Sequence, residues 1–355
     1  MVANLTTRLG QLTSSPAGGP YTGANKIING DMAIDQRYGG TAYTAVGNSK
    51  YVLDRWGSSA AVASKYTVQQ VADAPTGFTY SMKMVSLAAF TVGASDYYGV
   101  FQPVEGFNFA EFNFGTANAQ SVTASFWVKA TVAGTYGGVL YNAAATYTYP
   151  FTYAATTAWT KVSFTIPGQT AGVWATTNTT AGVFYFSLGV GTTTGTAFTW
   201  ANAFYLGATT GTGNIFGHVS DALQITGVKL EVGSIATPFV PDDYQVSLGK
   251  CQRYYRKITY PTSSWWAAGV AFQTTNAGAG FTWGPTMRAA PAVTLPTTTL
   301  NWDNATGGAI AGVTTSISSI GLDNFRIGGT AASGWVAGNA TLIEFTGNLI
   351  MDAEL

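Results

Sequence analysis

Hydrophobic and polar side chains alternate one by one over several stretches of the chain. The alternation is clearest in residues 122–129, 162–166, 184–190 and 228–232. In the first stretch, Val122, Ala124, Phe126 and Val128 share one face, whereas Trp127 belongs to the other. Because successive side chains of a β-strand point to opposite faces, this period of two predicts half-buried strands.

The segments between these stretches are rich in glycine, threonine, asparagine and alanine, as in residues 191–195 and 207–213. Such residues favour turns and loops over helices. Many short strands joined by such loops predict an all-β protein, built as a sandwich, a jelly roll or a barrel.

One segment favours a helix instead. After Pro241, either Asp242 or Asp243 can cap a helical run over residues 244–251. The strand-like texture then resumes and continues to Leu355. The sequence therefore divides into a leading segment, a large β domain, a short helical connector and a smaller C-terminal β domain, with expected bounds 1–24, 25–241, 242–257 and 258–355. The leading segment is either an arm that docks on a neighbouring protein or a frayed terminus.

Composition narrows the chemistry. Hydrophobic residues make up 46% of the 355 residues and charged residues only 9%, so the chain has ample material for cores and a surface of hydroxyls and amides. Sixteen basic and sixteen acidic residues cancel, which argues against nucleic acid as a partner. The single Cys251 and single His218 exclude an intrachain disulfide and a Cys/His zinc site.

The N-terminus lacks the apolar core of a signal peptide, and no stretch of about 18 apolar residues occurs. These features predict a protein made in the cytoplasm without membrane insertion.

Short sequence blocks in both domains carry a resemblance to known proteins. The blocks in the first domain are Asn25-Lys26-Ile27-Ile28-Asn29-Gly30-Asp31-Met32, Gln36-Arg37, Tyr51-Val52-Leu53-Asp54-Arg55-Trp56, Ile225-Thr226-Gly227-Val228-Lys229-Leu230-Glu231-Val232-Gly233 and Ala236-Thr237-Pro238-Phe239. Those of the connector and the second domain are Cys251-Gln252-Arg253-Tyr254-Tyr255, Met287-Arg288-Ala289-Ala290-Pro291 and Asp352-Ala353-Glu354-Leu355. Together these blocks resemble those of bacteriophage tail-fibre-like proteins that contain a carbohydrate-binding-module-like jelly roll.

The resemblance implies a fold and a setting. It implies a jelly-roll or β-sandwich first domain followed by a smaller C-terminal β-sandwich. It also implies a tail fibre or another external appendage of the virion, frequently a homotrimer, whose outer domain meets the host surface. Other phage tail or capsid proteins are then the expected partners of the N-terminal segment.

The distribution of carboxylates argues against an enzyme. Hydrolysis of a glycan needs two carboxylates across one bond, and no Asp or Glu occurs between Glu111 and Asp221 or between Asp243 and Asp303. Three carboxylates, Asp31, Asp35 and Asp54, remain close in sequence. They fit a depolymerase site, a weak calcium site without an EF-hand pattern, or a structural role in which Asp54 and Arg55 bond loops beside Trp56. We expect the structural role and no cofactor.

Aromatic residues are the main binding chemistry of the sequence, at 14% of the chain with ten tryptophans. Flat rings stack on the C–H faces of sugars, and Asn, Asp or Thr orient the hydroxyls. The candidate glycan-binding residues are Trp265, Trp266, Trp302, Asp303, Asn304 and Trp127. The alternative is that these rings fill cores and subunit interfaces. On a regular strand, adjacent Trp265 and Trp266 cannot both face one core.

The sequence leaves three functions open. The first is a non-enzymatic phage appendage that attaches to a host-surface glycan. The second is a purely structural virion protein, such as an adaptor, a baseplate component or a capsid-attached fibre. The third is a polysaccharide-degrading tailspike. A trimer interface in the C-terminal domain is also expected, because residues 258–302 carry six Phe and Trp residues and one formal charge, Arg288.

Overall fold

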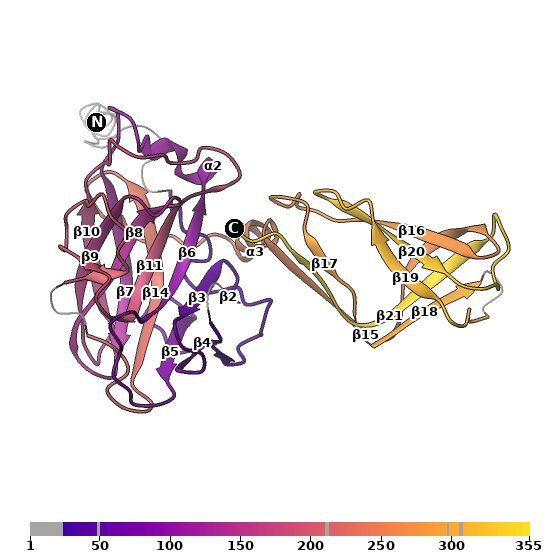
Figure 1. Cartoon of the computed structure of the whole chain (residues 1–355), viewed down its shortest axis with the longest axis horizontal. Coiled ribbons are helices and arrows are strands. Elements are labelled where there is room, and N and C mark those ends of the chain that lie inside the picture. The colour runs from indigo at the N-terminus through magenta and orange to yellow at the C-terminus, as the bar shows by residue number, and fades with distance from the viewer. Residues whose placement is uncertain (1–23, 48–49, 210–212, 297, 305–307) are drawn as a thin grey trace, which may run out of the picture. The chain divides into compact units, whose positions relative to one another are not determined.

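The structure, a computed structural model, describes residues 24–355 apart from 48–49, 210–212, 297 and 305–307. Within strands, the side chains of residues 261–266, 298–300 and 345 are also outside the described part. The expected N-terminal arm, residues 1–24, lies almost wholly outside the described residues. The chain divides into two compact units between Ser247 and Leu248. The first unit is drawn from indigo to salmon and the second from orange to yellow (Figure 1).

The first unit is a β-sandwich of two six-stranded antiparallel sheets, which confirms the expected jelly-roll-like architecture. In order across sheet A, the strands are β1 (Tyr43–Thr44), β4 (Tyr66–Val71), β5 (Ser81–Ser86), β14 (Ala222–Val232), β7 (Val122–Ala130) and β10 (Thr160–Ile166). Across sheet B they are β2 (Lys50–Leu53), β3 (Trp56–Ala60), β6 (Tyr97–Glu105), β11 (Thr180–Val190), β8 (Gly134–Asn142) and β9 (Thr148–Ala155). Two short parallel strands, β12 (Thr194–Gly195) and β13 (Gly207–Ala208), and the turns α2 (Gly106–Phe109) and η1 (Ala110–Phe112) complete the unit.

The alternation in the sequence sets the core between the sheets. Phe126 of β7 and Phe186 of β11 meet edge to face, with ring centroids 4.9 Å apart. The other alternating hydrophobic residues of these strands, Val122, Ala124, Val128, Phe184 and Leu188, are also buried. The two faces were therefore assigned correctly from the period of two.

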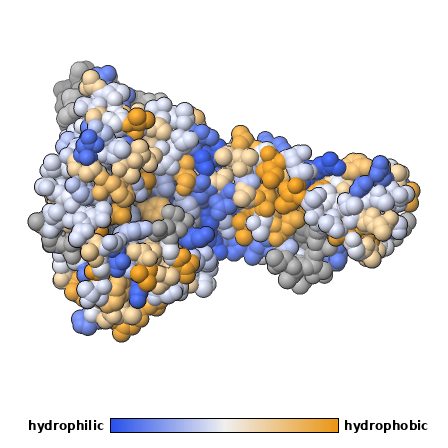
Figure 2. All heavy atoms as spheres, in the orientation of Figure 1, coloured by the Kyte–Doolittle hydropathy of each residue, from blue (hydrophilic) through white to orange (hydrophobic). Residues whose placement is uncertain are grey.

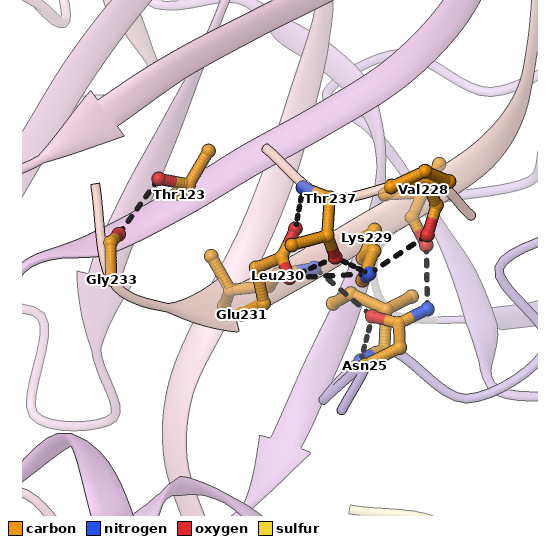
Figure 3. A network of polar contacts seen from close by, with 10 residues as sticks. Asn25, Thr123, Val228, Lys229, Leu230, Glu231, Gly233 and Thr237 are labelled. Atoms are coloured by element: carbon orange, nitrogen blue, oxygen red, sulfur yellow. Dashed lines mark hydrogen bonds and ion pairs between the residues drawn. The ribbon is translucent and has the colours of Figure 1, made fainter. Parts of the chain in front are cut away.

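A polar network fastens the first described residues to β14 (Figure 3). Asn25 accepts hydrogen bonds from the backbone N–H of Ile27 and Leu230, each at 3.0 Å, and donates to the Val228 carbonyl at 2.9 Å. Beside it, Lys229 and Glu231 form a buried ion pair with Nζ and Oε2 3.2 Å apart. Thr237 donates to Glu231 through its backbone N–H and its hydroxyl, at 2.9 and 2.6 Å. The segment after β14 is thereby held over the outer face of sheet A.

The second unit begins within the expected helix, α3 (Tyr244–Gln252), whose first turn is capped by the Asp243 carboxylate. Its strands form one seven-stranded antiparallel sheet in the order β17, β21, β15, β16, β20, β19, with β18 paired to β21. Their bounds are β15 (Tyr255–Gln273), β16 (Asn276–Thr282), β17 (Ala292–Thr294), β18 (Thr298–Asn304), β19 (Thr314–Ser318), β20 (Asn324–Thr330) and β21 (Ala340–Asp352). The unit is β, as expected, and a single sheet provides both sides of its core.

Long bulged strands explain how one sheet encloses a core. The pairing of β15 with β21 shifts register after Tyr260 and again after Trp265. Such bulges bend a strand and increase its twist. The core holds Trp302, Ile327, Trp335 and Ile343, all at most 3% exposed. None of the helices in the described residues is long and apolar enough to cross a membrane.

Candidate functional site

Aromatic side chains line the outer face of sheet B, on the side that does not contact sheet A. Register places Phe101 of β6 between Gly57 of β3 and Tyr185 of β11. The rings of Phe101 and Tyr185 are nearly parallel, with an interplanar angle of 11° and centroids 6.5 Å apart. Tyr141 of β8 pairs with the next outward residue of β11, Val183. These residues lie on the face of sheet B opposite to the face that forms the core with sheet A.

Small residues occupy the neighbouring row of this face. Ser59, Gly99, Ser187 and Gly137 follow one another across β3, β6, β11 and β8. A Cβ atom at Gly99 would lie 2.2 Å from Cζ of Tyr185, so only glycine lets this ring lie against the sheet. The Tyr185 hydroxyl is then 3.0 Å from Oγ of Ser59, within hydrogen-bonding distance. Of this row, Ser59 borders a hollow above the sheet.

Loops wall this hollow on both sides and form a cavity of about 450 Å³, which we call the sheet B pocket. Thr192 donates two hydrogen bonds to the Ala94 carbonyl, from its N–H at 2.8 Å and its hydroxyl at 2.9 Å. Phe204 packs edge-on against Tyr141, with ring centroids 5.3 Å apart. The residues that line the pocket are Ser59, Ala94, Ser95, Tyr97, Phe101, Tyr141, Tyr185, Thr192, Thr193, Phe204 and Leu206.

The pocket is electrically neutral. None of its described lining residues carries a charged side chain. Burial raises the pKa of Tyr141 to about 12 and raises the pKa of Tyr185 well above its usual value of 10, although the hydrogen bond with Ser59 acts in the opposite direction. Both phenols are therefore protonated at neutral pH and can donate hydrogen bonds. The arrangement suits a neutral ligand with apolar faces and polar edges.

The structure places the tryptophan predicted on the first domain away from this pocket. Trp127 points opposite to Phe126 and Val128, as expected, and is half-buried on the outer face of sheet A. The sheet B pocket lies on the other side of the sandwich, and Trp127 is not among its lining residues. The orientation of Trp127 was predicted correctly, whereas the pocket that the structure shows was missed.

The expectation of an exposed Trp302 is wrong. Its side chain is 0% exposed, packs edge-on against Trp335 and donates from Nε1 to the Thr315 hydroxyl at 3.2 Å. Asp303 is buried as well, and this burial raises its pKa, with the charge of Glu344 adding to the effect. Asn304 accepts a hydrogen bond from the Gly308 N–H at 3.0 Å. A ring in the core cannot stack on a sugar.

Trp265 and Trp266 lie in β15, but their side chains lie outside the described residues. The register shift between Trp265 and Ala267 means that the strand is not regular there. Strict alternation, on which the expected exposure of one of these rings depended, does not hold across such a bulge.

The three carboxylates that are close in sequence, Asp31, Asp35 and Asp54, have separate surroundings. Asp54 is fully buried and accepts from the Gln36 N–H at 2.6 Å. Asp35 accepts from the N–H groups of Tyr38 and Gly40, at 2.9 and 2.7 Å. Burial raises the pKa of Asp31. In the described part of the chain, no group of three or more His, Cys, Asp or Glu residues is placed to hold a metal ion.

The residues beside Asp54 also bond the backbone. Arg55 donates to the Pro103 carbonyl at 2.7 Å, and Trp56 donates from Nε1 to the Asn29 carbonyl at 3.0 Å. The block that contains them thus holds loops together, the role expected for Asp54 and Arg55.

No family model matches the chain, and no curated protein matches it. Among solved structures, it is similar to a putative sugar binding protein from Bacteroides thetaiotaomicron, with 12% identity over 59% of this chain and 100% of that chain and a TM-score of 0.33. It is also similar to the family 22 xylan-binding domain from Paenibacillus barcinonensis, with 9% identity over 61% and 100% of the two chains and a TM-score of 0.30. A third similar structure is the family 11 carbohydrate-binding module of a Clostridium thermocellum cellulase, with 10% identity over 56% of this chain and 98% of that chain and a TM-score of 0.29. At these scores the neighbours assign no ligand to this chain.

A signal for the sheet B pocket was present in the sequence. Tyr185 is an aromatic residue at an outward position of the alternating stretch 184–190. Residues 134–142 around Tyr141 do not alternate, and the loops that bring Thr192 and Phe204 over the sheet have no pattern that sets their path.

Proposed function

We propose that this chain is a non-enzymatic, glycan-binding appendage protein of a bacteriophage particle, and that the sheet B pocket holds a neutral sugar. The observation that supports glycan binding is the pocket itself, in which five aromatic rings and several hydroxyls surround a cavity of about 450 Å³ without a charged residue. Sugars offer an apolar C–H face to such rings and hydroxyl edges to Ser, Thr and Tyr. The volume is within the range of small-molecule sites, roughly 300–1,000 Å³.

The assignment to a virion rests on the sequence motifs. The blocks that begin at Asn25 and at Ile225 resemble those of phage tail-fibre-like proteins. Attachment to other tail or capsid proteins through the N-terminal segment, and a homotrimeric state, belong to the same proposal. Electron microscopy of virions with a labelled antibody tests it, and labelling of an external appendage is the expected result. An unlabelled virion would refute this assignment without affecting the glycan pocket.

A glycan array followed by titration calorimetry tests the pocket. We expect the full chain to bind a neutral host-surface oligosaccharide, and Tyr141→Ala and Phe204→Ala to weaken that binding about tenfold or more, because each removes a ring of the pocket. The control is Phe107→Ala, which removes a ring that is 61% exposed in α2 and does not line the pocket. Wild-type affinity in both pocket variants would contradict the assignment.

A tailspike activity is tested by incubation with purified host capsule or lipopolysaccharide. Glycoside hydrolysis uses paired carboxylates, and the described lining of the pocket contains none. We therefore expect the polysaccharide to keep its chain length. A shortening of the polysaccharide by the full chain would overturn the non-enzymatic assignment.

A further inference from the structure

A second hollow, of about 630 Å³, lies on the C-terminal unit and differs from the sheet B pocket in its charge. It lies over β15, β16 and β20. Of its described lining residues, Arg326 carries the single charge, and none is a carboxylate. Asn324, Ser319 and Thr282 supply polar groups at its edge. We call this hollow the Arg326 groove.

The guanidinium of Arg326 is held in place by an aromatic ring. Its central carbon lies 4.7 Å from the ring centroid of Phe272, which is 47% exposed. A guanidinium stacked by its face keeps its N–H groups free at the edge, where they can meet a planar anion through two parallel hydrogen bonds. Among the described residues, no ion pair includes Arg326. Asp323, three residues before it in sequence, accepts a hydrogen bond from Asn324 at 2.7 Å.

Glycines beneath this pair leave room for it and for a ligand. A Cβ atom at Gly278 would lie 3.0 Å from both Nε of Arg326 and Cε2 of Phe272, so a side chain there would push the two apart. Gly280, directly opposite Arg326 in the register of β16 and β20, has no atom within 4 Å of its Cβ position. The floor beside the guanidinium is therefore bare backbone, which permits the close approach of a flat ring.

We propose that the Arg326 groove binds an acidic sugar, with the sugar carboxylate on the Arg326 guanidinium and its C–H face over the Phe272 and Val270 side. One cation matches one carboxylate per sugar unit. A polyphosphate chain such as nucleic acid needs several cations along its path, and the groove has one. The Arg326 groove is separate from the sheet B pocket, and its proposed ligand is an acidic sugar, whereas that of the pocket is a neutral one.

Calorimetric titration of the full chain with acidic oligosaccharides tests the proposal. The probes are oligogalacturonate, an oligosaccharide of hyaluronan and sialyllactose, each with a methyl-esterified partner that has lost its charge. We expect at least one acid to bind and its ester to bind about tenfold or more weakly, with affinity falling as salt rises. Equal binding of acid and ester, or no binding of any of the three acids, would overturn the proposal.

Variants locate the site. Arg326→Gln and Phe272→Ala should each weaken binding of the acid about tenfold, and Arg326→Lys should restore only part of the affinity, because an ammonium lacks the bidentate edge. Lys65→Gln is the matched control, since Lys65 also lies over a ring, 4.8 Å from the centroid of Phe90, but in the other unit.

Three further measurements distinguish the Arg326 groove from the neutral pocket, from a general anion site and from a subunit interface. Tyr141→Ala should leave binding of the acid unchanged, so failure of the neutral pocket and failure of this groove are distinguishable. Inorganic phosphate that competes as well as the acidic sugar would show a general anion site and contradict the proposal. Loss of self-association in Phe272→Ala without any change in sugar binding would show that a second copy of the chain occupies the groove.

Discussion

Gly99 decides how the rings of the sheet B pocket lie. Its missing side chain lets Tyr185 rest on β6, and the hydroxyl of that ring then reaches Ser59. Gly30 has a comparable role in the motif at the start of the domain, where a Cβ atom would lie 2.1 Å from the Val228 carbonyl oxygen. Both glycines are required by a close approach of another group, and neither contacts the proposed ligand directly.

A substitution at Gly99 should therefore damage the pocket through Tyr185. We expect Gly99→Ala to weaken glycan binding about tenfold and to destabilise the fold by about 1–3 kcal/mol, the usual effect of overpacking. Gly134→Ala in β8 is the control, because the nearest atom to its Cβ position is 3.9 Å away. Calorimetric titration and thermal unfolding measure the two effects. A Gly99→Ala protein with unchanged affinity would show that Tyr185 does not shape the site.

The raised pKa values of the buried tyrosines predict how the stability of the fold changes at alkaline pH. Burial raises the pKa of Tyr141 from 10 to about 12, and it raises the pKa values of Tyr66 and Tyr153 further. Between pH 10 and these raised pKa values, the folded protein binds more protons than the unfolded chain, so its stability falls as pH rises. The contribution of Tyr141 is fully present below pH 10 and is lost as pH rises through about 12.

Urea unfolding over this alkaline range tests the sign of the linkage. Tyr141→Phe should reduce the loss of unfolding free energy between pH 10 and 12, because it removes one group with a raised pKa. The phenolate absorbance of the folded protein should rise less between pH 10 and 12 than that of the unfolded chain, because the buried tyrosines with raised pKa values titrate at higher pH. A stability that is flat across this range would contradict the raised pKa.

The motif residues were visible in the sequence, and the structure shows them holding backbone together. Asn25 accepts a hydrogen bond from the Leu230 N–H of β14, and Asp54 accepts one from the Gln36 N–H. Arg288 donates to the carbonyls of Ala353 and Glu354, each at 2.8 Å. Such residues point to a fold and not to a ligand. The role of Trp302 could not be predicted, because neither its burial nor the polar partner of its indole can be read from neighbouring residues.

The strands were the most predictable elements. In β14, Val228, Leu230 and Val232 face away from Lys229 and Glu231, as the alternation indicates. The alternation does not show that the polar face is covered too, with the Lys229 and Glu231 side chains 3% and 0% exposed. That cover comes from the segment around Thr237, which has no periodic pattern.

This covered ion pair predicts a large effect on stability. Removing one member of a buried pair leaves an uncompensated charge, so Glu231→Ala should cost about 3–5 kcal/mol in unfolding free energy. Replacing both residues, as Lys229→Met with Glu231→Leu, should recover much of this loss. At the partly exposed pair of Lys129 and Asp73, Asp73→Ala should cost about 1 kcal/mol or less. Urea unfolding of the variants is the measurement, and equal losses at the two pairs would contradict the argument.

The part of the chain that the structure describes forms two β units, and the helix expected between the domains was also predicted. The described aromatic side chains of the C-terminal unit lie in two environments. Trp302 lies in the core, and Phe281 and Trp283 pack on Phe325 of that core. Phe272 is 47% exposed. Composition could not distinguish these environments, because the number of rings in a segment is the same whether they fill its own core or a subunit interface.

The remaining apolar surface bears on the oligomeric state proposed for the chain. Figure 2 shows hydrophobic residues gathered on part of the visible face of the C-terminal unit, whereas much of the visible surface of the first unit has intermediate hydropathy. Exposed apolar patches of this kind mark interfaces or binding sites. A closed cyclic oligomer buries such a patch on every subunit without open-ended growth. The motif resemblance favours threefold symmetry in particular.

We therefore expect a homotrimer whose interface lies largely on the C-terminal unit, and light scattering of the full chain tests it. The expected mass is about three times the 37.1 kDa of one chain. Deleting residues 248–355, the second compact unit, should return the protein to a monomer, because it removes the proposed interface and leaves the core of the sandwich intact. A mass of 37.1 kDa for the full chain across micromolar concentrations would exclude the trimer. A trimer that survives the deletion would place the interface on the first unit.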